Sequence, residues 1–527
     1  FRRLQTMKYI TNKSKLLFLL LSVFSTPSLF AQEKGLDQQI DEAFKPFSDA
    51  ISNIIFFQIL GVPFVLILLV GSALFFTIYF GFVNIRRFPT AINVVRGKYD
   101  ELDESHGGKD SGESEEGEVT HFQALATAVS GTVGNGNIAG VALAIALGGP
   151  GATFWMVICG LLGMSSKFVE CTLGVQYRDV GEDGTIYGGP MYYISKGLKE
   201  RGFTMLGKVA AVFFAIFCIG GSFGGGNAAQ SNQATIVLKD LMNLQSSAAG
   251  FWIGIVLAIL VGIIIIGGIK RIAQVTEKVV PFMAVMYVVA CLYIILSNFT
   301  LIDDAFALIF AEAFNPTAIG VGSFIGVLLV GFKRAAFSNE AGAGSASIAH
   351  SAVKTKYSAS EGLVALLEPF IDTVVICTMT ALVIVIFNFG GAFQYGGEGA
   401  VMIDGISYEG AGITSKAFAQ YIPFSDVFLT IAVVLFAVST MISWSYYGLQ
   451  SWKYLFGRGK AADLAYKLLF LTFVIIGASA SMNSIWAFSD AMIFAMVFPN
   501  MVGLFFLFPV VKKELNRYLK AIRTIES

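Results

Sequence analysis

The chain has 527 residues, of which 55% are hydrophobic and only 14% are charged, and its mean hydropathy is +0.70. Soluble domains carry roughly 25% charged residues, so this composition indicates a polytopic membrane protein and excludes a disordered or fibrous chain. The 36 basic and 36 acidic residues balance, which removes any argument for nucleic-acid binding. Five cysteines without CxxC spacing and three histidines outside the centres of apolar runs disfavour disulfides, zinc and haem.

The N-terminal residues have the pattern of a secretory signal peptide. Basic residues between 8 and 15 precede an apolar stretch at 16–24, Pro27 follows it, and Ala31 suits a cleavage position. We therefore assign 1–31 to a signal peptide, with an uncleaved first anchor as the alternative. Cleavage would place the mature N-terminus outside the cell.

Residues 32–98 are expected to form a periplasmic N-terminus and one extra transmembrane helix, which spans about 54–83. Basic residues between 86 and 98 follow that helix, as the positive-inside tendency predicts for its cytoplasmic end. The acidic stretch 99–118 is typical of a solvated cytoplasmic linker.

Ten further apolar runs follow, and their lengths suit spanning helices of about 20 residues. Basic residues gather in every second loop between them, with Lys239 and Lys416 as exceptions in the other loops. This alternation places the C-terminus, with a tail at 513–527, in the cytoplasm. The runs lie near 122–147, 151–177, 206–238, 250–268, 279–297, 318–350, 360–388, 424–452, 466–480 and 485–510.

The first and sixth of these runs contain segments that make poor helix. Residues 130–140 include four glycines and two asparagines, and 331–345 mixes small and polar residues. Backbone groups released there need partners other than lipid. Defects in runs one and six predict two five-helix repeats of opposite orientation, 119–297 and 298–512, with a binding site between two broken helices. The alternative is that the small residues only permit close helix packing.

Broken helices offer ligand groups of both signs. Half-helix N-termini suit a carboxylate, and unwound carbonyls and C-termini suit a cation, so a small zwitterion fits both. The eighth run adds the hydroxyls of Ser439, Thr440 and Ser443, close on one helix face, and hydroxyl oxygens are hard ligands of the kind a sodium ion needs. Hydroxyls that bond back to their own helix are the alternative.

Ionisable residues inside the runs are costly at membrane depth and favour function. Lys333, Arg334 and Glu340 lie near the second break, either facing a cavity or one another, or near its cytoplasmic mouth. The remaining ones are more typical of structural ion pairs or cavity-facing groups and are assigned no role: Lys167, Glu170, Glu361, Glu368 and Asp372.

Three stretches carry a resemblance to a known family: GTVGNGNIAGVALAIALGGPGATFWM at 131–156, FKRAAFSNEAGAGSA at 332–346 and STMISWSYYG at 439–448. They closely resemble the alanine or glycine:cation symporters, the bacterial and archaeal sodium:alanine symporters, and the agreement extends over about 50–512. The resemblance implies an all-α, LeuT-type 5+5 inverted-repeat fold plus one extra N-terminal transmembrane helix, about 11 spans in all. It also implies sodium-coupled, sometimes proton-coupled, uptake of alanine or glycine.

The VGNGN word at 133–137 is similar to the VGxGN word of neurotransmitter:sodium symporters, and this likeness implies site residues. Asn135 stands where the family often has an apolar residue, which leaves the substrate range open. For Phe332 and Trp444, proposed as a size-limiting wall, ordinary packing is the alternative. The substrate-binding candidates are Thr132, Gly134, Asn135, Gly136, Asn137, Phe332, Asn339 and Trp444. The sodium candidates are the carbonyls of Ser130 and Val133 and the hydroxyls of Ser439, Thr440 and Ser443.

The predicted function is secondary active symport in the cell (inner) membrane, in which sodium entry drives uptake of a small neutral amino acid by alternating access. The predicted partners are the amino acid, the sodium ion and the bilayer, with no obligate protein partner and no cofactor apart from the co-transported ion. A proton-coupled transporter is the alternative. A channel or facilitator is less favoured because polarity is concentrated in two breaks, and an enzyme because no histidine pairs with serine or cysteine there.

Overall fold

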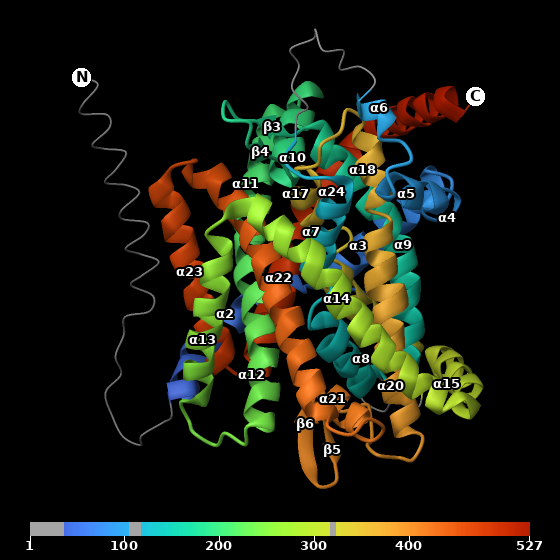
Figure 1. The fold of residues 1–527 in the computed structure, drawn as a ribbon, viewed down its shortest axis with the longest axis vertical. Helices are drawn as coiled ribbons and strands as arrows, with labels where there is room; N and C mark the ends of the chain where they lie inside the picture. The colour runs from blue at the N-terminus through green and yellow to red at the C-terminus, as the bar shows by residue number, and fades with distance from the viewer. Residues whose placement is uncertain (1–35, 105–116, 317–322, 527) are drawn as a thin grey trace.

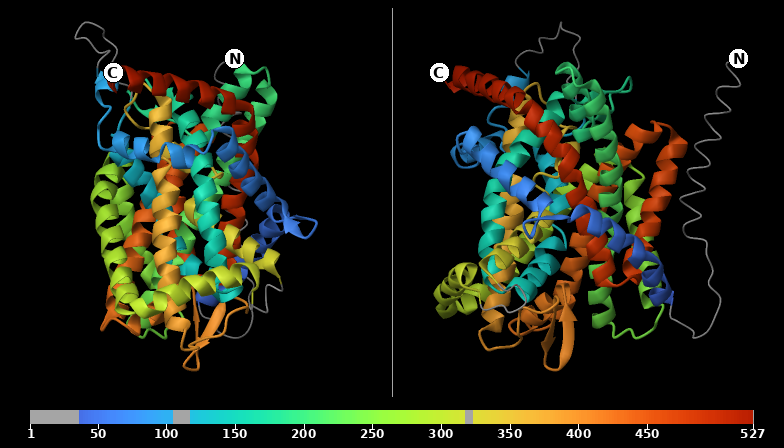
Figure 2. Two further views of the ribbon diagram at one scale, coloured as in Figure 1. Left: turned by 90° about the vertical axis from the view of Figure 1, so that its right-hand side faces the viewer. Right: turned by 180° about the vertical axis from the view of Figure 1, so that it is seen from behind.

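The computed structural model describes residues 36–104, 117–316 and 323–526. In this part of the chain the protein is a bundle of long helices, most of which run between the same two ends of the molecule (Figures 1 and 2). The hairpin of β5 (Ala400–Ile403) and β6 (Ile406–Glu409) marks one end, which we call the hairpin end. The opposite end carries α10 (Pro190–Glu200), and we call it the basic end. The predicted signal peptide lies outside the described residues.

Among the described residues, seven helical segments are long and apolar enough to cross a membrane. An eighth is a pair bent by 50°, in which α7 (His121–Thr132) is followed by the π-helical turn η1 (Gly136–Gly140) and α8 (Val141–Gly148). A mostly helical, multi-pass membrane protein is thus confirmed, and the count of eleven spans stays a prediction. The seven segments are α9 (Gly151–Gln176); α11 (Thr204–Phe223) with η2 (Gly224–Ala228) and α12 (Ala229–Leu241); α14 (Gly268–Ser297); α18 (Ser358–Val364) with α19 (Leu367–Pro369), η5 (Phe370–Cys377) and α20 (Thr378–Asn388); α22 (Ser425–Phe456); α23 (Lys460–Ser479); and α24 (Met482–Glu526).

Shorter elements complete the described part of the chain. Two apolar helices, α3 (Phe64–Tyr79) and α13 (Ala249–Ile265), are shorter than the seven segments. Three antiparallel hairpins each have two strands. The other elements are α2 (Leu36–Ile55), β1 (Gln58–Ile59), β2 (Val62–Pro63), α4 (Val83–Arg86), α5 (Phe88–Val95), α6 (Glu101–Glu104), β3 (Asp179–Val180), β4 (Ile186–Tyr187), η3 (Phe299–Leu301), α15 (Ile302–Phe314), α16 (Phe324–Asn339), α17 (Ala346–His350) and α21 (Ala411–Ala419).

The extra N-terminal helix differs from its prediction at 54–83. The hairpin β1–β2 interrupts that range, and the apolar helix α3 begins only at Phe64. The preceding helix α2 packs against α24, where Ser48 Oγ donates to the Ser484 carbonyl over 2.7 Å. Lys239, which departs from the regular distribution of basic loops, pairs with Asp37 of α2 over 3.0 Å. Its charge at the hairpin end therefore has a local acidic partner.

The two interrupted spans lie side by side and run in opposite directions. The first consists of α7 followed by η1 and α8, and the second of α16 followed by α17. α7 packs against α17, and α8 packs against α16. The first half of one span thus faces the second half of the other, which is the relative orientation that inverted repeats require. The predicted run at 318–350 begins partly outside the described residues.

Candidate functional site

The first break is held open by side chains of the protein. α7 begins at a capping box of Thr120 and Gln123 and ends at Val133, whose φ of −73° and ψ of 87° are not helical. The amide of Gly134 donates to Asn137 Oδ1 over 2.9 Å. The next amide, of Asn135, donates to Gln230 Oε1 over 3.0 Å. All residues from 130 to 140 are buried, so the backbone groups released by the break are satisfied without lipid or bulk water.

The second break is a tight, left-handed segment between α16 and α17. Glu340 ends α16 with a φ of 54°, and Gly342 and Gly344 follow with φ of 91° and 89°, a region that glycine adopts without strain. The Glu340 carboxylate accepts a hydrogen bond from Trp444 Nε1 of α22 over 3.0 Å. Asn500 Nδ2 of α24 donates to the Gly342 carbonyl over 2.9 Å. Side chains of distant helices thus fix the unwound backbone.

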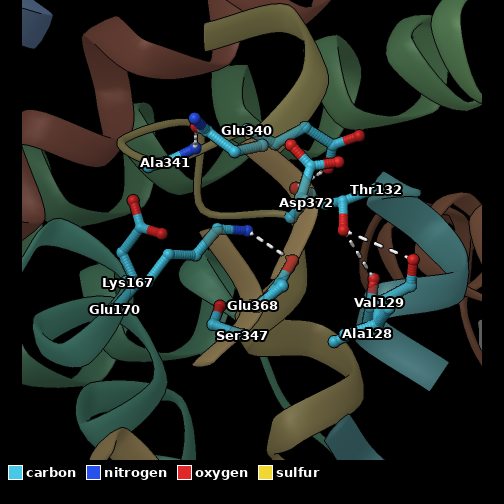
Figure 3. A network of polar contacts seen from close by, with 12 residues as sticks. Ala128, Val129, Thr132, Lys167, Glu170, Glu340, Ala341, Ser347, Glu368 and Asp372 are labelled. Atoms are coloured by element: carbon cyan, nitrogen blue, oxygen red, sulfur yellow. Dashed lines mark hydrogen bonds and ion pairs between the residues drawn. The ribbon is translucent and has the colours of Figure 1, made fainter. Parts of the chain in front are cut away.

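The two breaks meet at one buried carboxylate, Asp372 of η5. Asn137 Nδ2 of the first break donates to Asp372 Oδ1 over 2.7 Å. Ser338 Oγ, at the end of α16, donates to Asp372 Oδ2 over 2.9 Å, and Thr373 Oγ1 donates to the same oxygen over 2.7 Å. Figure 3 shows this region with Thr132, Glu340 and Asp372 labelled. Asp372 has no role assigned from the sequence, although a carboxyl group in an apolar span is a signal of function.

The structure brings three of the sodium candidates together between α7 and α22. Thr440 Oγ1 donates to the Ser130 carbonyl over 3.0 Å, and Ser130 Oγ donates to the Ser439 carbonyl over 2.8 Å. Ser443 lies further along the same helix, and its Oγ is buried without a hydrogen-bond partner among the described residues. Val133 is buried at the end of α7. A buried hydroxyl costs free energy unless it finds a ligand.

One sodium candidate bonds to its own helix. Ser439 Oγ donates to the Phe436 carbonyl over 3.0 Å and contacts Met283 Sδ at 3.4 Å. This is the back-bonding alternative that the sequence left open. The carbonyl of Ser439, rather than its hydroxyl, is the group that faces the first break.

A close contact requires glycine at position 134 of the first break, and Gly136 lies against α16. A Cβ on Gly134 would lie 2.4 Å from Thr440 Oγ1, and one on Gly136 would lie 3.4 Å from Ser338 Cα. Among the polar candidates, Thr132 Oγ1 bonds back to the Ala128 carbonyl over 3.3 Å. These contacts place Gly134 against α22 and Gly136 against the end of α16.

The remaining candidates lie in different surroundings. Asn135 Nδ2 donates to the Gln230 carbonyl over 3.2 Å, and Asn339 Nδ2 donates to Thr373 Oγ1 over 3.0 Å. Trp444 lies at the second break, where it contacts Glu340. Phe332 instead packs on Trp155 of α9, with 5.9 Å between ring centroids. Phe332 is thus placed by packing between α16 and α9.

A π-helical turn, η2, in the span formed by α11 and α12 was not identified from the sequence. Three consecutive glycines form part of η2, and a Cβ on Gly226 would lie only 2.1 Å from Trp444 Cγ. Gln230, one helical turn later, satisfies the Asn135 amide. The glycine triplet at 224–226 was the signal that could have predicted this close approach.

The basic residues near the second break lie on its hairpin-end side. Lys333 and Arg334 belong to α16, which packs against α8, and both pair with Asp490 of α24. The Lys333 Nζ to Asp490 Oδ2 distance is 2.9 Å. Both side chains thus lie between the second break and the hairpin end, where they face a carboxylate.

The profile of the sodium:alanine symporter family matches residues 45–527. The sodium/alanine symporter AgcS of Methanococcus maripaludis is 40% identical over 458 residues, which cover 86% of this chain and 94% of that protein. The chain belongs to the sodium:alanine symporter family. The resemblance seen in the three sequence stretches is thus confirmed, and the protein is a transporter and not an enzyme.

The names of two other relatives differ in the substrate that they give. The amino-acid carrier protein AlsT of Bacillus subtilis is 33% identical over 461 residues, which cover 86% of this chain and 89% of that protein. The probable sodium/glutamine symporter GlnT of the same organism is 31% identical over 456 residues, which cover 86% of this chain and 87% of that protein. In this sodium:alanine symporter family sodium is a co-transported ion, and no cofactor is indicated.

The glycine at 134 provides a direct test of the contact between the first break and α22. In G134A, the new Cβ would lie 2.4 Å from Thr440 Oγ1 and 3.0 Å from Gln230 Oε1, and both atoms are held by other hydrogen bonds. We expect uptake of labelled alanine into membrane vesicles to fall to background, because overpacking shifts the unwound segment. The matched control is G140A, whose Cβ would meet Trp486 at an ordinary 3.6 Å. Wild-type uptake by G134A at equal expression would contradict the assignment.

Proposed function

We propose that the protein is a secondary active symporter that couples sodium entry to uptake of a small neutral amino acid, alanine or glycine, by alternating access. The observation that carries this proposal is the meeting of two antiparallel broken spans at Asp372, next to the hydrogen bond from Thr440 to the Ser130 carbonyl. Membership of the sodium:alanine symporter family supports it. Groups for a zwitterion and for a cation are thereby adjacent in one buried region.

The polarity of the breaks suggests how an amino acid would be oriented. The half-helix formed by η1 and α8 begins at Gly136, so its N-terminal amides favour the substrate carboxylate. α16 ends at Asn339, and its C-terminal end favours the ammonium group, as does the Asp372 carboxylate. The substrate would take over amides that Asn137 and Gln230 now accept from. Because the substrate would contact the backbone at the glycines, the site has room only for a substrate with a small side chain.

The sodium ion is proposed to bind where α22 meets the first break. Oxygen ligands there come from the Ser130 and Val133 carbonyls and the Thr440 hydroxyl, together with Ser439. The Ser443 hydroxyl, which has no hydrogen-bond partner in the described part of the chain, supplies a further one. An ion that holds α7 against α22 would fix the unwound segment in the form that binds the amino acid. Each ligand would then favour binding of the other, which is the thermodynamic basis of coupling.

Alternating access is proposed to follow from a LeuT-type 5+5 arrangement of the repeats 119–297 and 298–512. The broken spans and their partners would rock against the remaining helices, so that the site opens to each side in turn. The antiparallel packing of α7–α8 on α17–α16 supports this arrangement.

The direction of transport requires an orientation in the membrane. Loops rich in lysine and arginine, such as 453–460 and 196–208, lie at the basic end, so we propose that this end and the C-terminus face the cytoplasm of a cell with an inner membrane. The first described helix, α2, begins at the hairpin end, which is then outside.

Proteoliposomes test the proposed function. An inward sodium gradient is expected to drive accumulation of labelled alanine, and glycine and serine should compete with it, whereas leucine and phenylalanine should not. The size limit follows from the glycine contacts at the breaks. Equal accumulation with and without a sodium gradient would refute sodium coupling, and alanine equilibration without accumulation would indicate a passive facilitator.

Removal of the buried Ser443 hydroxyl is expected to weaken sodium-dependent uptake without lowering thermal stability. In S443A, the sodium concentration for half-maximal uptake should rise by about tenfold, because contacts with charged groups contribute about 1.5–3 kcal/mol. Thermal stability in the absence of sodium should stay equal or rise, since the hydroxyl has no partner. S445A is the matched control, because Ser445 Oγ donates to the Ile442 carbonyl of its own helix. An unchanged sodium dependence of S443A would remove Ser443 from the site.

Single cysteines test the orientation, because all five native cysteines are buried. In G390C and G459C the new side chain meets no heavy atom within 4 Å, and the two positions lie at the hairpin end and the basic end, respectively. A membrane-impermeant maleimide is expected to label G390C on intact cells and G459C only after permeabilisation, while the wild-type protein stays unlabelled. The reverse pattern would invert the proposed topology.

A further inference from the structure

A line of buried titratable side chains connects the basic end with the paired breaks. His121, at the start of α7, contacts one oxygen of Glu361 through Nδ1. The other oxygen of Glu361 lies 2.5 Å from His350 Nδ1 on α17. Glu368 follows, and its Oε1 accepts a hydrogen bond from Lys167 Nζ over 2.9 Å. The His121 side chain is 11% exposed, and the other four are fully buried.

One link in this line is not a hydrogen bond. His350 Nε2 and Glu368 Oε2 face each other at 3.6 Å, and both atoms are buried without a hydrogen-bond partner among the described residues. This distance is longer than a normal hydrogen bond, and a small side-chain rotation would close it. His350 thus lies between two carboxylates. It contacts Glu361 at hydrogen-bonding distance, whereas its distance to Glu368 is too long for a hydrogen bond.

The charges around this line do not balance. Figure 3 shows Lys167 reaching from α9 toward Glu368, with Glu170, Glu340 and Asp372 around them. These last three carboxyl groups are buried and have no ion-pair partner within 4.0 Å among the described residues. The titratable groups that face the line are His121 on α7; Lys167, Glu170 and Cys171 on α9; Tyr193 on α10; Glu340 after α16; His350 on α17; Glu361 and Glu368 on α18 and α19; Asp372 on η5; and Tyr447 on α22.

Around the line, five carboxyl groups therefore share one lysine and two histidines among the described residues. Uncompensated charge at this depth is costly, so the excess negative charge must be matched by cations or protons. One sodium ion together with a zwitterion adds a single net positive charge, which does not suffice. Protons are the remaining counter-charge that the described side chains can hold.

We propose that the line Glu361, His350 and Glu368 is a proton pathway, through which the protein moves a proton between the basic end and the paired breaks in addition to its sodium ion. In each step, the His350 imidazolium gives the proton on Nε2 to Glu368 Oε2, which becomes a neutral carboxylic acid. The neutral imidazole keeps its proton on Nδ1, so this proton first moves to Nε2 by tautomeric exchange or a ring flip. The vacated Nδ1 then takes a new proton from the side of Glu361 and His121, which restores the imidazolium. The proposal rests on the proposed function, because the proton travels with the amino-acid cycle.

The experiment measures protons and alanine in the same proteoliposomes. Purified protein is reconstituted with a trapped pH dye, at equal sodium and pH on both sides and with the membrane potential clamped. Addition of alanine outside is expected to acidify the interior of wild-type liposomes. In H350Q this acidification should be lost, while sodium-dependent exchange of internal for external alanine persists, because exchange needs no net proton movement. H121Q, at the mouth of the line, should slow the acidification and provides a second variant if H350Q does not fold.

The outcomes separate the pathway from the proposed function. E312Q is the matched control, since Glu312 is a buried carboxyl on α15 that accepts a hydrogen bond from Tyr395 over 2.7 Å, away from the line. It should keep the wild-type ratio of protons to alanine. Sodium-dependent alanine uptake by the wild type without acidification would overturn the proton pathway and leave the symporter proposal standing. A wild-type ratio of protons to alanine in both H350Q and H121Q would overturn the route through Glu361, His350 and Glu368. Absence of sodium-dependent alanine uptake by the wild type would refute the symporter proposal itself.

Discussion

Inside a membrane, every backbone amide and carbonyl that a helix break releases must find its partner within the protein. The two broken spans of this transporter meet that requirement with side chains. Gln230 of α12 and Asn137 of the break itself accept hydrogen bonds from amides of the first break, and Asn500 of α24 donates to the Gly342 carbonyl of the second. Because these partners are hydrogen-bonding side chains and not regular helix, the breaks remain places where a ligand can substitute for the protein. The same constraint that makes the breaks costly also makes them suited to bind a ligand, as proposed for the amino acid and its ion.

The antiparallel packing of the two spans turns two separate breaks into one site. Asn137 comes from the first and Ser338 from the second, and both donate to Asp372. Thr440 joins the first break to α22, and Trp444 of the same helix joins the second. A ligand that changes the conformation of one break therefore affects the other break through few intervening hydrogen bonds. This short connection offers a physical route for coupling between an ion and an amino acid.

Local composition allowed the breaks to be predicted, because the glycines and asparagines at 130–140 and 331–345 stand out against an apolar background. The family resemblance added the expected substrate, alanine or glycine, and the expected co-transported ion, sodium. Membership of the family is confirmed. Asp372 and Gln230 could not be assigned in this way, since their importance depends on partners far away in sequence. The start of α3 at Phe64 was missed because the mostly apolar residues 54–63 continue the pattern of a spanning helix, whereas α2 ends at Ile55 and residues 58–63 form a hairpin. The residue roles at the sodium and substrate sites stay predictions.

The central claim is that both breaks together form the binding site for an amino acid and its ion. Hydrogen–deuterium exchange of the backbone amides at 133–137 and 340–345, measured with sodium, with alanine and with both, tests it most directly. We predict that alanine slows exchange at both segments only when sodium is present, because each ligand stabilises the form that binds the other. Unchanged exchange at either break with both ligands at saturating concentration would contradict the account.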